Sequence, residues 1–165
     1  MSTVASGSRS KRPATYGRGR AVRLESELYA MDIPVHLTIC AASGCPFEQA
    51  AVAKMVCEAL EQTASRMGHR LFAYCLMPDH LHVLLSPHES GTSMSGFLRR
   101  FKSFTTRRHQ KATGQKRLWQ YSARDRLLRP GEDLLALATY VANNPVRREL
   151  VETWTDWPYT NVFVE

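Results

Sequence analysis

The sequence lacks any apolar run long enough to cross a membrane, and it lacks the pattern of a secretory signal peptide. We therefore expect a cytoplasmic protein that makes no membrane contact. Cysteine is also scarce, and the spacing of the few that occur is not that of a zinc ribbon. The four cysteines lie in or beside apolar segments, so we expect reduced, buried thiols at Cys40, Cys45, Cys57 and Cys75.

Acidic residues are missing from the beginning of the chain, where the first one is Glu25. Residues 1–23 are rich in Ser, Gly and Arg without a hydrophobic period, so they are expected to form a disordered basic arm. Such an arm either binds nucleic acid electrostatically or only keeps the protein in solution. The remaining residues, 24–165, are enough for a single domain with a hydrophobic core.

Acidic residues are also missing between Ser90 and Arg124, where the chain carries nine basic residues. A solvated helix face is the simpler explanation, but a one-sign run of this length favours a polyanionic partner that neutralises the repulsion. The net charge of +7 agrees with that expectation. The residues that we expect to contact DNA, including aromatic side chains for base stacking, are Arg99, Arg100, Lys102, Arg107, Arg108, Lys111, Lys116, Arg117, Trp119 and Tyr121.

Hydrophobic periodicity predicts a domain of both strands and helices. Alternating or continuous apolar patterns predict strands at residues 34–41, 71–77, 80–85 and 124–129, of which the second and third can form a hairpin. Helical spacing predicts one helix from Pro46 to Gly68 and another that begins after a Ser93 cap. A last helix is predicted from Glu132 to Asn144, where the following proline stops it.

Two histidines flank a leucine at the beginning of the predicted strand 80–85. Because side chains alternate across a strand, His80, His82 and Leu84 share one face, and the opposite, core-facing set is Leu81, Val83 and Leu85. Two imidazoles on one face are suitable ligands for a divalent ion. An isolated His-x-His pair on a strand is, however, more often part of a solvated polar face. His36 would lie near this pair if its strand is a neighbour.

Tyr140 and Asn144 are four residues apart in the last predicted helix, so both side chains lie on one flank of it. The simplest explanation of Tyr140 is a tyrosine at the rim of the core. The Asn144 side chain places a carbonyl oxygen one helical turn from it.

Three motifs in consistent order resemble a known family. M-P-D-H-L-H-V-L-L resembles the His-hydrophobic-His signature of the single-tyrosine HUH transposases, which are IS200-like. L-W-Q-Y followed by D-R-L-L-R, and then Y-V-A-N-N-P-V-R, resembles the subgroup of REP-associated tyrosine transposases. The resemblance extends from about Val35 to Val151. It implies an α/β (α+β) fold of the ferredoxin-like type, an antiparallel sheet backed by helices, and usually a homodimer.

The resemblance also implies roles for individual residues. His80 and His82 match the metal-binding pair, Asn144 the third ligand and Tyr140 the nucleophile. The implied cofactor is Mg2+ or Mn2+, although two histidines and an amide suit Zn2+ as well. The implied activity is metal-dependent nicking and strand transfer of single-stranded or hairpin DNA through a 5′-phosphotyrosine, as in DNA transposition at the bacterial nucleoid.

Two other functions are compatible with the same residues. The first is a non-catalytic protein, derived from such a transposase, that binds hairpin DNA or RNA. The second is a metal-dependent hydrolase that uses water and forms no covalent intermediate. The chain also departs from the subgroup at residues 121–125, where relatives often carry further aromatic residues before the aspartate, so DNA contacts near this turn are expected to differ.

Overall fold

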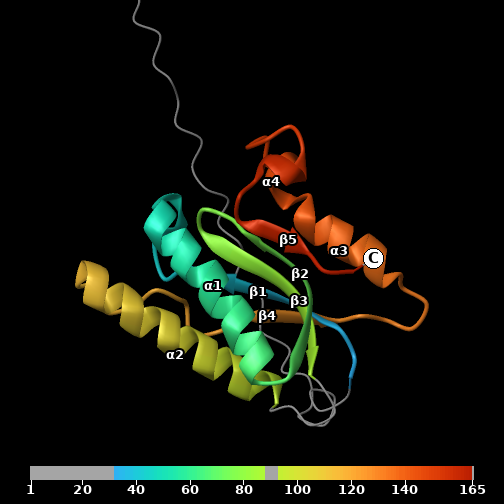
Figure 1. Cartoon of the computed structure of the whole chain (residues 1–165), viewed down its shortest axis with the longest axis horizontal. Helices are drawn as coiled ribbons and strands as arrows, with labels where there is room; N and C mark the ends of the chain where they lie inside the picture. Colours follow the sequence, from blue (N-terminus) through green and yellow to red (C-terminus); the bar gives the residue numbers. More distant parts are fainter. Residues whose placement is uncertain (1–31, 88–92, 165) are drawn as a thin grey trace, which may run out of the picture.

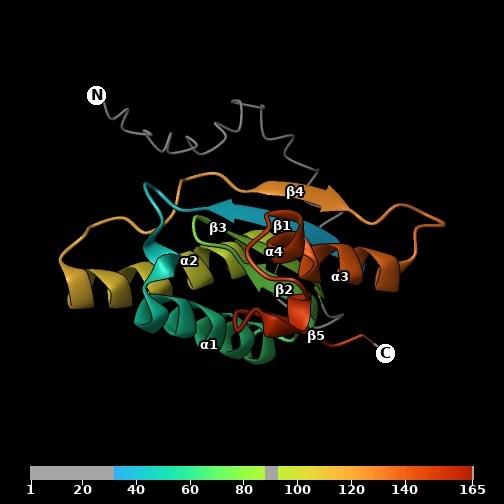
Figure 2. The same cartoon turned by 90° about the horizontal axis from the view of Figure 1, so that it is seen from above.

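Five strands form one antiparallel sheet in the computed structural model of the chain, which describes residues 32–87 and 93–164 (Figure 1). The predicted basic arm, residues 1–23, lies outside the described residues. The strand order is β4-β1-β3-β2-β5, with β4 and β5 at the two edges (Figure 2). The strands are β1 (Val35–Cys40), β2 (His69–Leu76), β3 (His80–Pro87), β4 (Arg124–Leu127) and β5 (Thr160–Val162).

Two long helices connect the strands in the order of a ferredoxin-like fold. The helix α1 (Ala50–Arg66) follows β1, and α2 (Met94–Thr113) follows the β2–β3 hairpin. The sequence β1-α1-β2-β3-α2-β4 with sheet order β4-β1-β3-β2 is the ferredoxin-like arrangement. The predicted fold class is therefore confirmed, and β5 extends the sheet beyond β2.

The main hydrophobic core lies between the sheet and the pair α1 and α2. Val35, Leu37 and Ile39 alternate along β1 and are fully buried, as the sequence pattern predicts. They pack in one cluster with Phe97 and Phe101 of α2. Because adjacent side chains of a strand point to opposite faces, the intervening residues of β1 face away from these helices.

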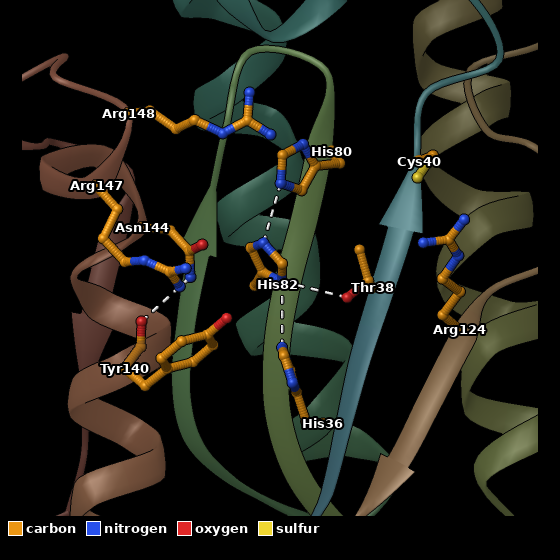
Figure 3. Close-up of a pocket in the computed structure, with 10 residues that line it drawn as sticks. All are labelled: His36, Thr38, Cys40, His80, His82, Arg124, Tyr140, Asn144, Arg147 and Arg148. Carbon is orange, nitrogen blue, oxygen red and sulfur yellow. Dashed lines mark hydrogen bonds between the residues drawn. The ribbon is translucent and has the colours of Figure 1, made fainter. Parts of the chain in front are cut away.

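A second apolar cluster covers part of the opposite face of the sheet. The helix α3 (Leu134–Ala142) packs Ala138 and Val141 against Leu84 and Cys75, and all four side chains are fully buried. Leu84 therefore belongs to a core although it shares a face with the two histidines of β3. The end of the helix lies next to a pocket that residues of β3 also line (Figure 3).

The predicted last helix is divided in two. Asp133 caps α3, since its Oδ1 accepts a hydrogen bond from the backbone N–H of Leu135 at 2.8 Å. The helix ends at Ala142, and a single turn, α4 (Asn144–Arg147), begins at Asn144. Pro145 explains the break, because proline has no N–H to continue the ladder of hydrogen bonds.

Other boundaries shift by a few residues. The predicted helix from Pro46 consists of a 3-10 turn, η2 (Pro46–Glu48), followed by α1, and β4 ends two residues before the predicted strand does. The Ser93 cap of α2 is confirmed, since its hydroxyl accepts from the N–H of Gly96 at 3.3 Å. The last 3-10 turn, η3 (Trp154–Asp156), leads to β5.

All four cysteines are free thiols, as expected, but their burial differs from the prediction. Cys75 is buried, Cys40 and Cys57 are half-buried, and Cys45 is exposed in the turn after β1. Among the described residues, no helix combines the length and the hydrophobicity that crossing a bilayer requires.

Candidate functional site

A pocket of about 280 Å³ opens on the face of the sheet that carries α3 (Figure 3). Strands β1, β3 and β4 form its floor, and the end of α3 and the turn α4 form one wall (Figure 3). The structure brings all four residues predicted for catalysis and metal binding to this pocket. The ten lining residues are His36, Thr38, Cys40, His80, His82, Arg124, Tyr140, Asn144, Arg147 and Arg148.

The two histidines of β3 point their Nε2 atoms toward one another. The Nε2 atoms of His80 and His82 are 3.0 Å apart, and His80 is only 3% exposed. Two nitrogens that bind one ion at about 2.1 Å are about 3.0 Å apart in octahedral geometry and about 3.4 Å apart in tetrahedral geometry. The pair therefore has the spacing that a shared divalent ion requires.

The other ring nitrogen of each histidine is held by a neighbour. His80 Nδ1 donates to Asp79 Oδ1 at 2.6 Å, and this hydrogen bond is the main reason that the pKa of Asp79 is lowered. His82 Nδ1 lies 3.1 Å from His36 Nε2 and 3.2 Å from Thr38 Oγ1. Metal-binding histidines usually have such partners, which orient the ring and leave the other nitrogen for the ion.

Burial favours the neutral form of two histidines at the pocket floor, His36 and His82. It lowers the pKa of His36 to about 4, with a further contribution from the positive charge of Arg126. It also lowers the pKa of His82, and the neighbouring His80 ring adds to this effect. A neutral imidazole is the form that binds a metal ion, so both rings are in the competent state at pH 7.

Asn144 lies 9% exposed at the start of α4, with its amide nitrogen used by the backbone. Its Nδ2 donates to the carbonyl of Val141 at 2.9 Å and to that of Tyr140 at 3.2 Å. The Val141 bond replaces the one that Pro145 cannot donate. This arrangement turns the side-chain oxygen toward the histidine pair (Figure 3).

The donor set fits a divalent ion through two imidazoles and one amide oxygen. The described residues include no group of three or more His, Cys, Asp or Glu side chains arranged to hold a metal ion. The candidate set differs from such groups because its third member is an amide, which is a ligand that Mg2+ and Mn2+ accept. Water or a phosphate oxygen would complete the coordination.

Tyr140 stands at the wall of the pocket, on the last turn of α3 and 46% exposed. The guanidinium carbon of Arg147 lies 4.6 Å from the centre of its ring. The ring of His36 meets it edge-on at 6.5 Å between centres. The hydroxyl points into the pocket beside the histidines (Figure 3).

Three arginines give the pocket a positive charge that the sequence analysis did not assign to the site. Arg124 faces it from β4, opposite Thr38, while Arg147 and Arg148 face it from the C-terminal end of α4. Among the described residues that line the pocket, none is acidic. The alternation of β4 and the R-R pair after Asn144-Pro145 were the signals available in the sequence.

The basic helix α2 lies on the other side of the sheet from this pocket. Its apolar face packs in the main core with Leu81 and Val83, which point away from His80 and His82. The predicted DNA-contacting residues that are exposed, on α2 and the loop after it, are Arg99, Arg100, Arg107, Arg108, Lys111, Lys116 and Arg117. They form a second positive surface, separate from the pocket.

The structure corrects the expectation for Trp119. Trp119 is 5% exposed, its Nε1 donates to Thr105 Oγ1 at 2.8 Å, and its ring packs on Phe47 and Phe101. It is a core residue because an isolated bridge to Ala41 draws its segment against the sheet. Base stacking by this side chain is therefore excluded in the folded domain.

The structure also assigns a different contact to Lys102. Its Nζ donates to the backbone carbonyls of Gln120, Tyr121 and Ser122 at 3.0–3.4 Å, so it anchors the loop rather than extending toward a phosphate. Tyr121 is 89% exposed on that loop, with the guanidinium carbon of Arg117 4.3 Å from its ring centre. Its exposure leaves the predicted stacking role possible.

Comparison with known proteins shows the family of the chain. Residues 29–124 match the family model described as "Transposase IS200 like". The chain belongs to the IS200-like transposases. The match covers the histidine pair and ends before Tyr140 and Asn144.

Two proteins that are similar to the chain are described as REP-associated tyrosine transposases. A Haemophilus influenzae protein with the provisional name of REP-associated tyrosine transposase is 28% identical to this chain over 113 residues. The matched region is 62% of this chain and 64% of the relative. The chain thus spans less than two thirds of that relative. A solved structure described as the REP-associated tyrosine transposase bound to a REP hairpin superposes with a TM-score of 0.67 at 20% identity, covering 80% of this chain and 78% of that one.

Proposed function

We propose that this IS200-like transposase nicks single-stranded DNA beside hairpin-forming sequences, with a divalent metal ion, and transfers the strand through a 5′-phosphotyrosine. The observation that carries the proposal is the convergence of Tyr140, Asn144 and the paired Nε2 atoms of His80 and His82 on one positively charged pocket. Membership of the transposase family and the hairpin bound to the structural relative support the same reaction class.

The proposed reaction is a phosphoryl exchange with no net change in bond type. The hydroxyl oxygen of Tyr140 attacks the scissile phosphorus, a Tyr–O–P bond forms, and the bond from phosphorus to the 3′-oxygen breaks. The phenol proton ends on the released 3′-oxygen. The covalent link preserves the bond energy for rejoining, so no external energy source is needed.

The chain's own residues hold the reactants for this step. His80, His82 and Asn144 would hold a divalent ion, which when bound polarises the phosphate and stabilises the charge that develops in transfer. Asp79 fixes the ring of His80, while Thr38 and His36 fix that of His82. The exposed ring of Tyr140 can approach a phosphate without rearrangement of the core.

The partner that we propose is hairpin DNA with a single-stranded flank. The pocket would receive the flank, and exposed basic residues of α2 would bind backbone phosphates on the other side of the sheet. A homodimer, as the resemblance implies, stays a prediction. A protein that only binds hairpins would share this surface and form no covalent adduct.

The deciding experiment is incubation with hairpin DNA that carries a single-stranded flank, in Mn2+ or in EDTA, followed by denaturing gels and peptide mapping. We expect a covalent protein–DNA adduct in Mn2+ that maps to Tyr140 and is absent in EDTA. Tyr140→Phe should lose the adduct and keep DNA binding, because it removes only the nucleophilic oxygen. His80→Ala and His82→Ala should abolish cleavage and leave binding within a few-fold.

Tyr121→Phe is the matched control, since it makes the same change outside the pocket. It should keep the adduct. Cleavage that forms no adduct and persists in Tyr140→Phe would indicate hydrolysis by water. DNA binding without cleavage would indicate a protein that only binds DNA. An adduct on Tyr121, or full activity in EDTA, would overturn the assignment of the site.

A further inference from the structure

Arg147 makes a contact that neither the sequence motifs nor the proposed metal site explains. It leaves the end of α4 and places its guanidinium over the ring of Tyr140, seven residues earlier, at 4.6 Å from the ring centre. The side chain is exposed, and it takes part in none of the ion pairs found among the described residues. The pocket wall thus presents a cation over the ring of the candidate nucleophile.

The contact with the ring does not consume the hydrogen-bond donors of this guanidinium. A guanidinium over an aromatic face is attracted through its positive charge, and it carries five N–H donors that can bind an anion. Among the described residues that line the pocket, there is no carboxylate that could occupy these donors. No carboxylate of these described lining residues would therefore compete with an anion bound near Tyr140.

The local backbone holds this arrangement in place. Asn144 bonds to the carbonyls of Tyr140 and Val141, so the turn that carries Arg147 is tied to the turn that carries the tyrosine. The backbone N–H of Arg147 donates to the carbonyl of Asn143 at 3.0 Å. His36 limits the ring from another side with an edge-on contact at 6.5 Å.

We propose that Arg147 is a catalytic residue that binds the scissile phosphate as it transfers to Tyr140 and remains on the phosphotyrosine. This inference rests on the proposed function and adds a residue to it. As the Tyr–O–P bond forms, the non-bridging oxygens come within reach of a cation already stacked on the same ring. The planar donors then stabilise the charge of the transition state, and the contact with the ring keeps them aligned.

The test compares Arg147→Gln and Arg147→Lys with the wild type in single-turnover adduct formation at saturating hairpin DNA and Mn2+. Loss of one such donor group typically lowers the rate by about 100-fold, and we expect this for Arg147→Gln. Arg147→Lys retains the charge without the planar fork, so it should be faster than the glutamine variant by about tenfold. DNA affinity in EDTA and the melting temperature should stay near those of the wild type.

Arg70→Gln is the matched control. Arg70 also lies over an aromatic ring, that of Phe72 at 5.4 Å, but it pairs in the sheet with Ser86, at the end of β3 opposite the histidine pair. It should react at the wild-type rate. Three results would each overturn the role of Arg147. The first is an Arg147→Gln rate equal to that of the wild type, and the second is an Arg147→Lys rate as low as that of Arg147→Gln. The third is a similar loss of rate in Arg70→Gln. Absence of any adduct in the wild type would instead overturn the proposed function, and this role with it.

Discussion

At the scale of single residues, the site depends on which ring nitrogen of each histidine already has a hydrogen-bond partner. The short bond from His80 Nδ1 to Asp79 leaves Nε2 as the nitrogen that faces His82. The same logic applies to Asn144, whose amide nitrogen is used by backbone carbonyls. Because the second polar atom of each side chain already has a hydrogen-bond partner, the remaining atoms would be oriented for a shared metal ion.

Asp79→Asn should weaken Mn2+ binding by about 10–100-fold, because an amide orients the imidazole less strongly and lowers its basicity as a ligand. Isothermal titration of the metal into DNA-free protein measures this directly. Asp32→Asn is the control, because the Asp32 carboxylate accepts a hydrogen bond from Ser86 and lies near Arg70. This variant should bind Mn2+ as the wild type does. An unchanged affinity in Asp79→Asn would count against His80 as a ligand.

At the scale of elements, the short turn α4 carries more of the site than its length suggests. Its first residue is Asn144 and its last is Arg147. The turn ends in a Schellman motif, in which the N–H of Leu150 bonds to the carbonyl of Pro145 and that of Glu149 to Val146, both at 2.9 Å. Glu149 closes this motif with φ of 57°, a conformation that favours glycine.

Glu149→Gly should therefore stabilise the domain. Relief of the left-handed strain should outweigh the extra backbone entropy that glycine loses on folding, by roughly 0.5–1 kcal/mol. Thermal unfolding should show a rise in melting temperature of about 1–4 °C. Glu152→Gly, an exposed residue near by whose φ is not positive, should not raise it. A lower melting temperature for Glu149→Gly would contradict the strain argument.

The helix α2 offers a second test at this scale. Charge reversal at Arg107 and Arg108 should weaken hairpin binding and lower the slope of log K against log salt by roughly 2, because two phosphate contacts are lost. Since α2 lies across the sheet from the pocket, the adduct rate at saturating DNA should not change. Fluorescence anisotropy over a salt series gives the slope.

Reversal of Lys54 and Arg66, on the adjacent helix α1, changes the net charge equally and is the control. It should leave the slope within experimental error of the wild type. An unchanged slope in the Arg107 and Arg108 variant would mean that this face of α2 is only solvated.

At the scale of the whole molecule, the sheet is covered on both faces and separates two positively charged surfaces. The pocket occupies the face shared with α3, and the exposed cations of α2 occupy the other. Several histidines are buried in this structure, and His69 is among them at 6% exposed. Its Nδ1 donates to the carbonyl of Met67 at 3.2 Å, its ring packs on Phe97, and burial lowers its pKa.

The stability of the metal-free protein should fall as the pH is lowered from about 7 to 5. A histidine whose pKa is lowered in the folded state binds its proton more readily in the unfolded state, where the pKa is about 6.5. The contribution of such a histidine to the free energy of unfolding is therefore fully present above the unfolded-state pKa. It decreases as the pH falls toward the folded-state pKa, by up to about 1.4 kcal/mol per pH unit for each such group. His36, with a pKa of about 4, acts in the same direction.

Urea unfolding at pH 7.5 and pH 5 in EDTA measures the effect. His69→Phe keeps an aromatic ring against Phe97 and removes the titrating group, so its loss of stability on acidification should be smaller. The same pH dependence in this variant and in the wild type would show that His69 does not contribute.

The local patterns of the sequence determined the elements and the orientation of their side chains. Alternation predicted that His80 and His82 share a face, because the two-residue period of a strand needs no knowledge of its neighbours. The four-residue spacing placed Tyr140 near Asn144, although the break at Pro145 changed the helix that carries them. The side-chain periods of a strand and of a helix are properties of a few consecutive backbone residues.

Only the tertiary structure decided what meets across the sheet. The antiparallel pairing of β1 with β3 brings His36 against His82, 46 residues away, and the packing of α3 beside them completes the pocket. Packing also decided that Trp119 is buried while Arg147 stacks on Tyr140. Burial and contact depend on which surfaces the fold brings together, and the local pattern of a segment does not contain that information.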